Sequence, residues 1–477
     1  MLNKTIQFVL ILLFIFTPIA FGSMDLWAYS LMELGILFII ILWAIQRFSD
    51  STSTTNIKHQ SAISVSSFPI IILLLSLFLA LIVFQMIPIP SEMMQIISPK
   101  TYELRHQLSI MNDPLQKTPL SFVPFVTKIE FFKWLTLSGL FLFILHWKFS
   151  EDGYRILNQL IIVIFLMGVF EALYGMFEFF SGHHHILYIK GITSVTGTFI
   201  NHNYFAGYLL MVIPLSMGFL FHREAIHKGQ SRGWRHRLSS LDGKTLLIGF
   251  GLMVMILGLL FSSSRMGIIC LLLSFTLIIF LFRDPQRKEK KFSKTSILIL
   301  GLAMLWAIWI GLDSVLRTFF TAPGDFKMRW MIWLNTFQIV KEFPLFGSGL
   351  GTFNQVFPMH RAFYIRGLVT HAENDYLQLA SEVGLVGIGI LLILFVFLFF
   401  KVVSRIRSLY QFGTQRYIGI GGLVGILALM FHSTVERNLQ VPANAFLYTF
   451  IWAIALRVAL DQGMINTNAT NKTQQIR

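Results

Sequence analysis

Long apolar runs separated by short polar segments make up most of this chain. Windows of about 20 predominantly apolar residues are long enough to cross a bilayer as helices. They fall at 5–23, 28–46, 67–89, 129–147, 157–180, 203–221, 245–262, 266–282, 296–312, 377–400, 417–433 and 441–460. Because only helices and closed barrels satisfy their backbone hydrogen bonds in lipid, the pattern predicts an all-α, polytopic membrane helix bundle of about twelve transmembrane helices.

The composition agrees with a membrane protein and excludes several other classes. Hydrophobic residues make up 55% of the 477 residues and charged residues only 13%, against about 25% charged residues in soluble domains. The formal net charge is +15, but the basic residues fall mostly in short segments between apolar runs, so we expect no nucleic-acid partner. The single cysteine, Cys270, excludes an intrachain disulfide, a CxxC pair and a cysteine zinc cage.

The distribution of basic residues predicts which side of the membrane each loop faces. Every second loop is rich in lysine and arginine, most densely 223–244 and 283–294. The positive-inside rule therefore places both termini in the cytoplasm. The segments predicted to share the outer side are 90–128, 181–202, 262–265, 314–376 and 434–440.

The two ends of the chain call for separate interpretations. Residues 1–22, with Lys4 ahead of an apolar stretch, resemble a signal peptide. No small-residue cleavage site follows, however, and the next apolar run begins within a few residues, so we expect a retained first span. The Asn- and Thr-rich segment 463–477 predicts a disordered cytoplasmic tail.

The long outer loop 314–376 contains a second kind of helix. Its apolar side chains recur at helical spacing between charged residues, at Phe326, Trp330, Trp333, Leu334, Phe337 and Val340. This spacing predicts an amphipathic helix lying on the outer leaflet of the membrane. Pro344 and the glycine-rich run 347–351 predict a tight turn after it.

The end of the same loop concentrates polar chemistry just before an apolar run. His371 and Glu373 are followed by Asn374 and Asp375. One interpretation is helix capping with acidic residues in the first turn. The functional interpretation is a general base with an orienting neighbour.

Arg265 is the most informative single charge. It follows Ser262, Ser263 and Ser264 in a turn between two predicted spans. It is either an arginine that snorkels from a helix end or, with the serine hydroxyls, an anion receptor suited to phosphate.

Two further outer segments contain polar side chains. Asn201, His202 and Asn203 stand at the entrance of a span, where they either cap the helix or face a site. The run His183–His185 has no partner at metal-ligand spacing, and we interpret it as a solvated loop. No DxD or HExxH motif is present, so we expect neither a metal site nor another cofactor.

Together these segments resemble the O-antigen ligase and polymerase family of bacterial membrane glycosyltransferases. The motifs that carry the resemblance are Gly197-Thr198-Phe199 with Asn201-x-Asn203, Ser262-x-Ser264-Arg265-x-Gly267, Arg329-x-x-x-Trp333, Pro344-Leu345-Phe346-Gly347-x-Gly349-Leu350-Gly351, Glu373-Asn374-Asp375-Tyr376-Leu377-Gln378 and His432-Ser433-x-Val435, extending through Gln440-x-Pro442-Ala443-Asn444-Ala445. The resemblance divides the chain into N-terminal transmembrane helices at 1–155, a ligase-like domain at 156–462 that includes the periplasmic loop 314–376, and the tail.

The resemblance implies a metal-independent transfer at the periplasmic face of the bacterial inner membrane. The donor would be a glycan linked to undecaprenyl diphosphate, and the acceptor a hydroxyl of a glycan, a lipid-A core or a protein. Ligase, repeat-unit polymerase and protein O-glycosyltransferase share this chemistry. In another class, a transporter of ions or lipid-linked glycan would use Glu171 and Glu178, although no inverted repeat supports it.

The family pattern assigns roles to particular residues, with two departures. Arg265 matches an arginine that holds the diphosphate, and Arg329 and Asn203 lie in matching motifs. Glu373 occupies the usual histidine position, so His371 or Glu373 is the expected base. His202 stands where relatives often have arginine, so the second diphosphate ligand is open between Lys190, His202, Arg361 and Arg366.

Overall fold

The chain folds almost entirely into helices. The computed structural model describes residues 2–52, 68–108, 117–147, 155–187, 189–191, 194–227, 243–281, 322–364, 367–408 and 415–475. The longer helices are α1 (Leu2–Ile19), α2 (Leu26–Thr52), α3 (Phe68–Met86), α6 (Pro124–His146), α7 (Arg155–Phe180), α8 (His202–His227), α10 (Gly243–Phe261), α11 (Arg265–Leu281), α13 (Ala322–Glu342), α15 (Asp375–Ser408), α16 (Arg416–His432) and α17 (Pro442–Gln475). Short elements between them are η1 (Phe21–Ser23), α4 (Ser91–Ile97), α5 (Pro99–Leu108), α14 (Phe353–His360) and two hairpins, β1 (Pro88–Ile89) with β2 (Thr118–Pro119) and β3 (His185–Ile186) with β4 (Ile189–Lys190).

The prediction of an all-α, polytopic membrane protein is confirmed. Within the described residues, nine helices are long and apolar enough to cross a membrane, and α11 and α16 are shorter apolar helices. These eleven helices coincide with the predicted windows, and the window 296–312 lies outside the described residues. The first run packs into the bundle, where Phe14 of α1 contacts Phe446 and Phe450 of α17.

α8 and α17 form the centre of the bundle. The segments His202–Ala225 of α8 and Pro442–Leu460 of α17 are almost wholly buried, whereas less than a third of α2 and of α15 is buried. α8 packs closely along α16, and a Cβ added to Gly421 of α16 would lie 2.4 Å from Pro214 O of α8. Small residues at such contacts allow helices to approach closely in lipid, where no hydrophobic force drives them together. The start of α8 is thereby placed beside the end of α16.

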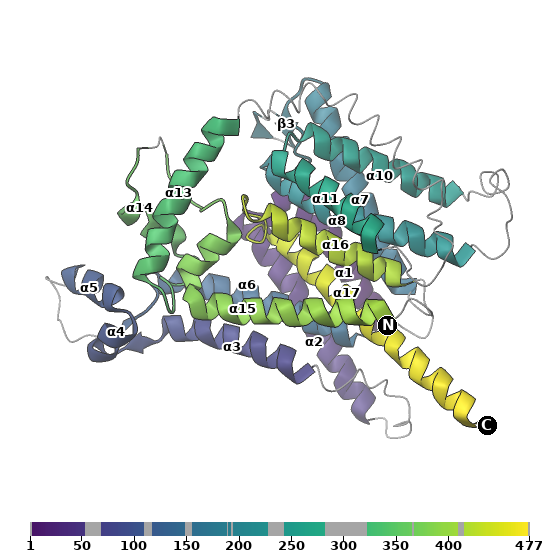
Figure 1. Ribbon diagram of the computed structural model, residues 1–477, viewed down its shortest axis with the longest axis horizontal. Helices are drawn as coiled ribbons and strands as arrows, with labels where there is room; N and C mark the ends of the chain where they lie inside the picture. The colour runs from purple at the N-terminus through teal and green to yellow at the C-terminus, as the bar shows by residue number, and fades with distance from the viewer. Residues whose placement is uncertain are drawn as a thin grey trace.

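The segments predicted to face outward gather at one end of the bundle. Figure 1 shows α4, α5, α13 and α14 at the left, and both chain ends toward the right. Hydrogen bonds join these segments across the sequence: Phe122 N donates to Ser348 O at 3.0 Å, and Gln85 Nε2 donates to Phe346 O at 2.6 Å. The predicted outer segments 90–128 and 314–376 therefore lie at the same end of the bundle.

A break in α15 ties the outer loop to the membrane helices. Gly384 has φ 66° and ψ −173°, a conformation that glycine alone adopts readily. The N–H of Leu385 donates to Pro344 O at 2.8 Å, which satisfies a donor that the break releases. The N–H of Val386 donates likewise to Leu345 O at 3.2 Å. Backbone at membrane depth must be satisfied inside the protein, so the loop and the break depend on each other.

α13 contains the helix predicted around 326–340 and extends it at both ends. Ile332 and Ile339 of α13, with Phe343 just after it, are buried in a cluster with residues of α14. Phe326 and Trp330 lie on the exposed side. Apolar residues on both sides of a helix indicate that it packs on the protein with one side and keeps a second apolar surface free for another contact.

The carboxyl end of the chain belongs to the last helix, α17. α17 continues as a helix to Gln475, through most of the segment 463–477 that we expected to be disordered. After Pro442, Gly463 is the only helix breaker before Gln475. One glycine lowers helix stability by about 1 kcal/mol, which does not stop a helix that is already formed.

Substituting Gly384 tests the break in α15. In Gly384→Ala, the new Cβ would lie 2.3 Å from Leu345 O and the backbone would be strained. We expect a loss of at least about 1–3 kcal/mol, measured as a lower thermal unfolding midpoint in detergent. Gly389→Ala in the same helix is the matched control, because no atom lies within 4 Å of the added Cβ. Equal midpoints for the two variants would contradict the interdependence of break and loop.

Candidate functional site

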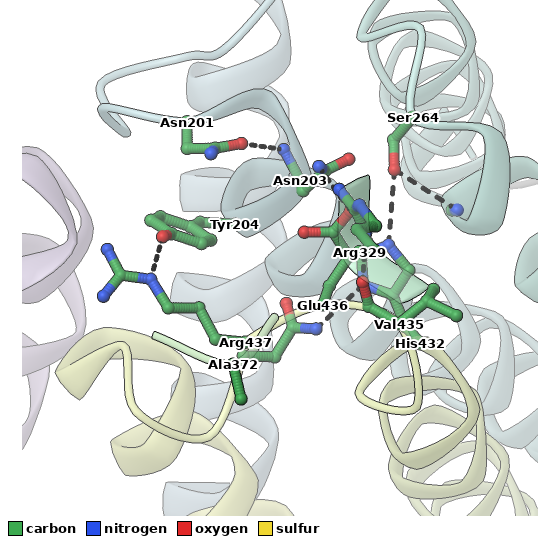
Figure 2. Close-up of polar contacts among 12 residues, drawn as sticks. Asn201, Asn203, Tyr204, Ser264, Arg329, Ala372, His432, Val435, Glu436 and Arg437 are labelled. Carbon is green, nitrogen blue, oxygen red and sulfur yellow. Dashed lines mark hydrogen bonds and ion pairs between the residues drawn. The ribbon is translucent and has the colours of Figure 1, made fainter. Parts of the chain in front are cut away.

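Four predicted outer segments meet at the site shown in Figure 2. They are the start of α8, the turn between α10 and α11, α13 of the long loop, and the turn between α16 and α17. The loop 371–374 that precedes α15 adjoins them. The geometry of each segment decides which of its side chains are available for chemistry.

At the start of α8, capping and site contact are divided between two asparagines. Asn201 Oδ1 accepts a hydrogen bond from Asn203 N at 2.8 Å, as an N-cap does. Asn203 is buried, and its Nδ2 donates to Glu436 Oε1 at 2.7 Å. Asn201 therefore caps the helix, and Asn203 faces the site.

Glu436 also binds Arg329, which connects α13 to the end of the bundle. Arg329 Nη2 lies 2.5 Å from Glu436 Oε1, and Arg329 Nη1 donates to Val435 O. Burial raises the pKa of the Glu436 carboxyl to about 7, and the positive charge of Arg329 acts in the opposite direction. Arg329, a predicted substrate-binding residue, thus has its charge balanced within the protein.

A chain of buried polar groups links the α10–α11 turn to the α16–α17 turn. Ser264 Oγ lies 3.3 Å from His432 Nε2, and His432 Nδ1 lies 3.0 Å from Asn438 Nδ2. Ser264 Oγ also accepts from Gly267 N at 3.3 Å and so caps α11. Because its partners lie within the protein, the Ser264 hydroxyl serves the turn. Arg265, half-buried at the first position of α11, is the charged group that this turn presents.

Asp375 fixes the position of the α16–α17 turn relative to α15. Its Oδ2 accepts hydrogen bonds from Asn438 N at 2.8 Å and Leu439 N at 2.9 Å. Its own N–H donates to Ser433 O at 3.1 Å. Asn374 caps α15 by accepting from Leu377 N at 2.9 Å. Capping in this segment is therefore carried out by Asn374.

The loop that carries His371 and Glu373 is held from both sides. Trp333 Nε1 of α13 donates to Ala372 O at 3.0 Å, and Ala372 N donates to Gln378 Oε1 at 2.9 Å. Glu373 has φ 51°, in the left-handed region. That conformation costs a non-glycine residue about 1–2 kcal/mol, so the surrounding contacts maintain it.

His371 is a neutral imidazole in this setting. Burial lowers its pKa to about 3, and the positive charge of Arg437 acts in the same direction. Its Nδ1 is enclosed and has no hydrogen-bond partner among the described residues. A neutral imidazole with an unused nitrogen is able to accept a proton.

Arg437 extends from the α16–α17 turn toward the start of α8. Its Nε donates to the Tyr204 hydroxyl, and its guanidinium carbon lies 5.0 Å from the centre of the Tyr204 ring. Figure 2 shows this arginine on the side of Glu436 away from Ser264. The ring holds the cation through a cation–π contact.

The remaining predicted residues lie in several places. His202 is half-buried at the first position of α8 and acts electrostatically on His432. Lys190 lies in β4, paired with His185 of the β3 hairpin. Arg361 is exposed after α14 and donates to Gly367 O at 3.5 Å. Arg366 lies outside the described residues.

Two charged residues of this site were absent from the predicted set, Glu436 and Arg437. Both were visible in the sequence as charges in a short outer turn after His432. The sequence signal that would have selected them is a short turn between two apolar runs that contains two adjacent, oppositely charged residues. Charged side chains next to a span are uncommon and mark candidate functional sites.

Residues 250–392 match the family model described as O-antigen ligase. The predicted family resemblance is confirmed. The matched segment includes Arg265, Arg329, His371 and Glu373, while the start of α8 and the α16–α17 turn lie outside it. No curated protein matches the chain. Residues 250–392 are therefore similar to the O-antigen ligase family, and the apolar helices are those of a multi-pass membrane protein.

Breaking the Arg329–Glu436 pair tests the join between α13 and the bundle. In Glu436→Gln, Arg329 loses its counter-ion, and we expect a loss of about 1–3 kcal/mol, less than for a fully buried pair because 26% of the Arg329 side chain is exposed. The measurement is the thermal unfolding midpoint in detergent.

The matched control is Glu103→Gln, which breaks the exposed Lys100–Glu103 pair at 3.0 Å. Exposed pairs contribute little to stability, so its midpoint should stay close to that of the wild type. A Glu436→Gln protein that is no less stable than Glu103→Gln would contradict the structural role of the buried carboxylate.

Proposed function

We propose that this protein is a membrane glycosyltransferase that moves a glycan from undecaprenyl diphosphate to an acceptor hydroxyl. The site faces the periplasm, the protein lies in the bacterial inner membrane, and both termini are cytoplasmic. The family match supports a ligase or polymerase of lipid-linked glycans. The observation that carries the finer proposal is neutral His371, two residues before Glu373 and under the influence of the Arg437 cation.

In this proposal His371 acts as the general base. The acceptor O–H proton passes to the imidazole, the acceptor oxygen bonds to the anomeric carbon, and the bond from that carbon to the diphosphate oxygen breaks with its electron pair. A positioned base contributes about 10²–10⁴-fold to such a step. Glu373, two residues away, stabilises the protonated imidazole or takes its place.

The leaving diphosphate gathers negative charge as the bond breaks. Preplaced guanidinium groups stabilise such charge without reorganising during the reaction. Arg265 at the start of α11 is assigned this role, because its turn is joined through Ser264 and His432 to the rest of the site. Among the described residues, no three His, Cys, Asp or Glu side chains gather as metal ligands. The proposed step uses the protein's own cations.

The transporter alternative is less well supported by the contacts of its key residue. Glu171 of α7 is fully buried and accepts hydrogen bonds from Thr198 N at 2.7 Å and Thr198 Oγ1 at 2.8 Å. It thus holds the turn that leads into α8. A carboxylate engaged in this way supports the site's architecture rather than an ion path.

Glycan transfer in proteoliposomes tests the mechanism. We expect wild-type protein to transfer glycan from undecaprenyl diphosphate with no added metal. His371→Ala, Glu373→Ala and Arg265→Ala should each lower the rate, and loss of the base should lower it by about 10²–10⁴-fold. Lys327→Ala, which removes an exposed cation of α13, is the matched control and should retain the wild-type rate.

The outcomes separate the parts of this proposal. Full activity in all three site variants would refute the residue assignment, and an absolute requirement for Mg²⁺ would refute the metal-free mechanism. In a deletion strain, accumulation of undecaprenyl-linked polymer would indicate a ligase, and accumulation of single repeat units would indicate a polymerase.

Cysteine labelling tests the proposed sidedness. In a Cys270→Ser background, Tyr364→Cys and Ile96→Cys place thiols at positions that are 84% and 82% exposed. We expect a membrane-impermeant maleimide to label both in intact spheroplasts. Ser404→Cys, exposed near the other end of α15, should react only after the membrane is permeabilised. The reverse pattern would place the site in the cytoplasm.

A further inference from the structure

Arg437 is a cation whose charge no carboxylate balances at close range. Among the described residues, no Asp or Glu oxygen lies within 4.0 Å of its guanidinium. Its Nε donates to the Tyr204 hydroxyl, but its Nη1 is enclosed without a hydrogen-bond partner. A buried, unsatisfied charged donor costs free energy, so its position calls for an explanation.

The neighbouring cations are in a different state. Arg329 is paired with Glu436 at 2.5 Å, and Lys133 of α6 is paired with Glu130. Both cations therefore have counter-ions of their own. Arg437 is held instead by neutral groups, the ring and hydroxyl of Tyr204, which fix its direction and leave its charge uncompensated.

The same arginine acts on the proposed base. Burial is the main cause of the low pKa of His371, and the charge of Arg437 is the next. The other charged groups near His371 are Lys133, which also lowers the pKa, Glu373 of its own loop, and the balanced Arg329–Glu436 pair. Arg437 also acts electrostatically on the buried Asp375, but no carboxylate oxygen of the described residues lies within 4.0 Å of its guanidinium.

We propose that Arg437 is an anion-binding residue that makes activation of the acceptor depend on the arrival of the donor's diphosphate. The inference rests on the proposed function. In the empty site, the Arg437 charge disfavours a proton on His371. When a diphosphate pairs with Arg437, the negative charge compensates the cation, and the imidazole accepts the acceptor's proton more readily.

This arrangement orders the reaction. The proton moves from the acceptor O–H to His371 only when the diphosphate is in place to leave as the new bond forms, and solvent later takes the proton from the imidazole. An acceptor that enters first meets a weak base. The donor therefore provides both the glycan and the charge that activates its partner.

The first experiment measures binding of farnesyl diphosphate, with uncharged farnesol as the matched ligand, to wild type and Arg437→Gln in detergent. We expect the variant to lose about tenfold or more in affinity for farnesyl diphosphate, because a charge-assisted contact is lost, and to bind farnesol unchanged. Arg437→Lys should recover part of the affinity. Lys327→Gln removes an exposed cation and should change neither.

The second experiment measures the pH dependence of kcat/KM for the undecaprenyl-linked donor, which reports the free enzyme. Removing a positive charge beside a histidine raises the histidine's pKa. The acid limb of the Arg437→Gln profile, where activity falls as His371 becomes protonated, should therefore move to a pH about one unit higher than in wild type. Arg437→Lys retains the charge and should keep the wild-type acid limb. Tyr204→Phe loses the hydrogen bond to Nε but retains the cation, so it should raise the KM for donor without moving the acid limb.

Several results would overturn the proposal. The proposal is wrong if Arg437→Gln binds farnesyl diphosphate as tightly as wild type does. It is also wrong if the variant is active and the acid limb of its pH profile lies where that of wild type does. If Arg437→Gln fails to fold, the Arg437→Lys and Tyr204→Phe profiles decide, since both must keep the wild-type acid limb. A wild type that transfers no glycan refutes the proposed function, whereas binding of farnesyl diphosphate that depends on Arg437 would still support the anion site.

Discussion

One buried carboxylate determines how the outer part of this protein sits on its membrane helices. Glu436 Oε1 accepts a hydrogen bond from Asn203 at the start of α8 and forms an ion pair with Arg329 of α13. A buried carboxylate needs such partners, because its own desolvation is costly. Meeting that need brings α13, which belongs to the long outer loop, over the end of the bundle. Trp333 of the same helix then holds the backbone of the loop that carries His371.

The contrast between two arginines separates structure from chemistry in this site. Arg329 was expected to bind substrate, yet its charge is balanced by Glu436 and a backbone carbonyl. Arg437 was not selected, yet it is the cation that no carboxylate balances within reach among the described residues. In a partly buried site, an uncompensated cation is the group that gains most when an anion arrives. The counter-ion, more than the residue type, indicates which arginine is available.

Much of the fold followed from patterns that are local in sequence. The apolar windows correspond to helices because a span needs only length and hydrophobicity. The spacing around Trp330 and Phe337 predicted α13, and the glycines around Gly349 predicted the turn that the break at Gly384 requires.

The sequence by itself determined the class of protein, a resemblance to a family and the end of the bundle at which polar chemistry collects, because hydrophobic length, loop charge and motif order are properties of consecutive residues. Only the tertiary structure decided which polar side chain serves which purpose. Asn201 caps and Asn203 binds Glu436; Ser264 caps and bonds His432; Arg329 is paired and Arg437 is not. The two caps are local contacts, but the bonds to Glu436 and His432 join residues more than a hundred positions apart. A charge or a hydrogen-bond donor is available only if no distant partner has already used it.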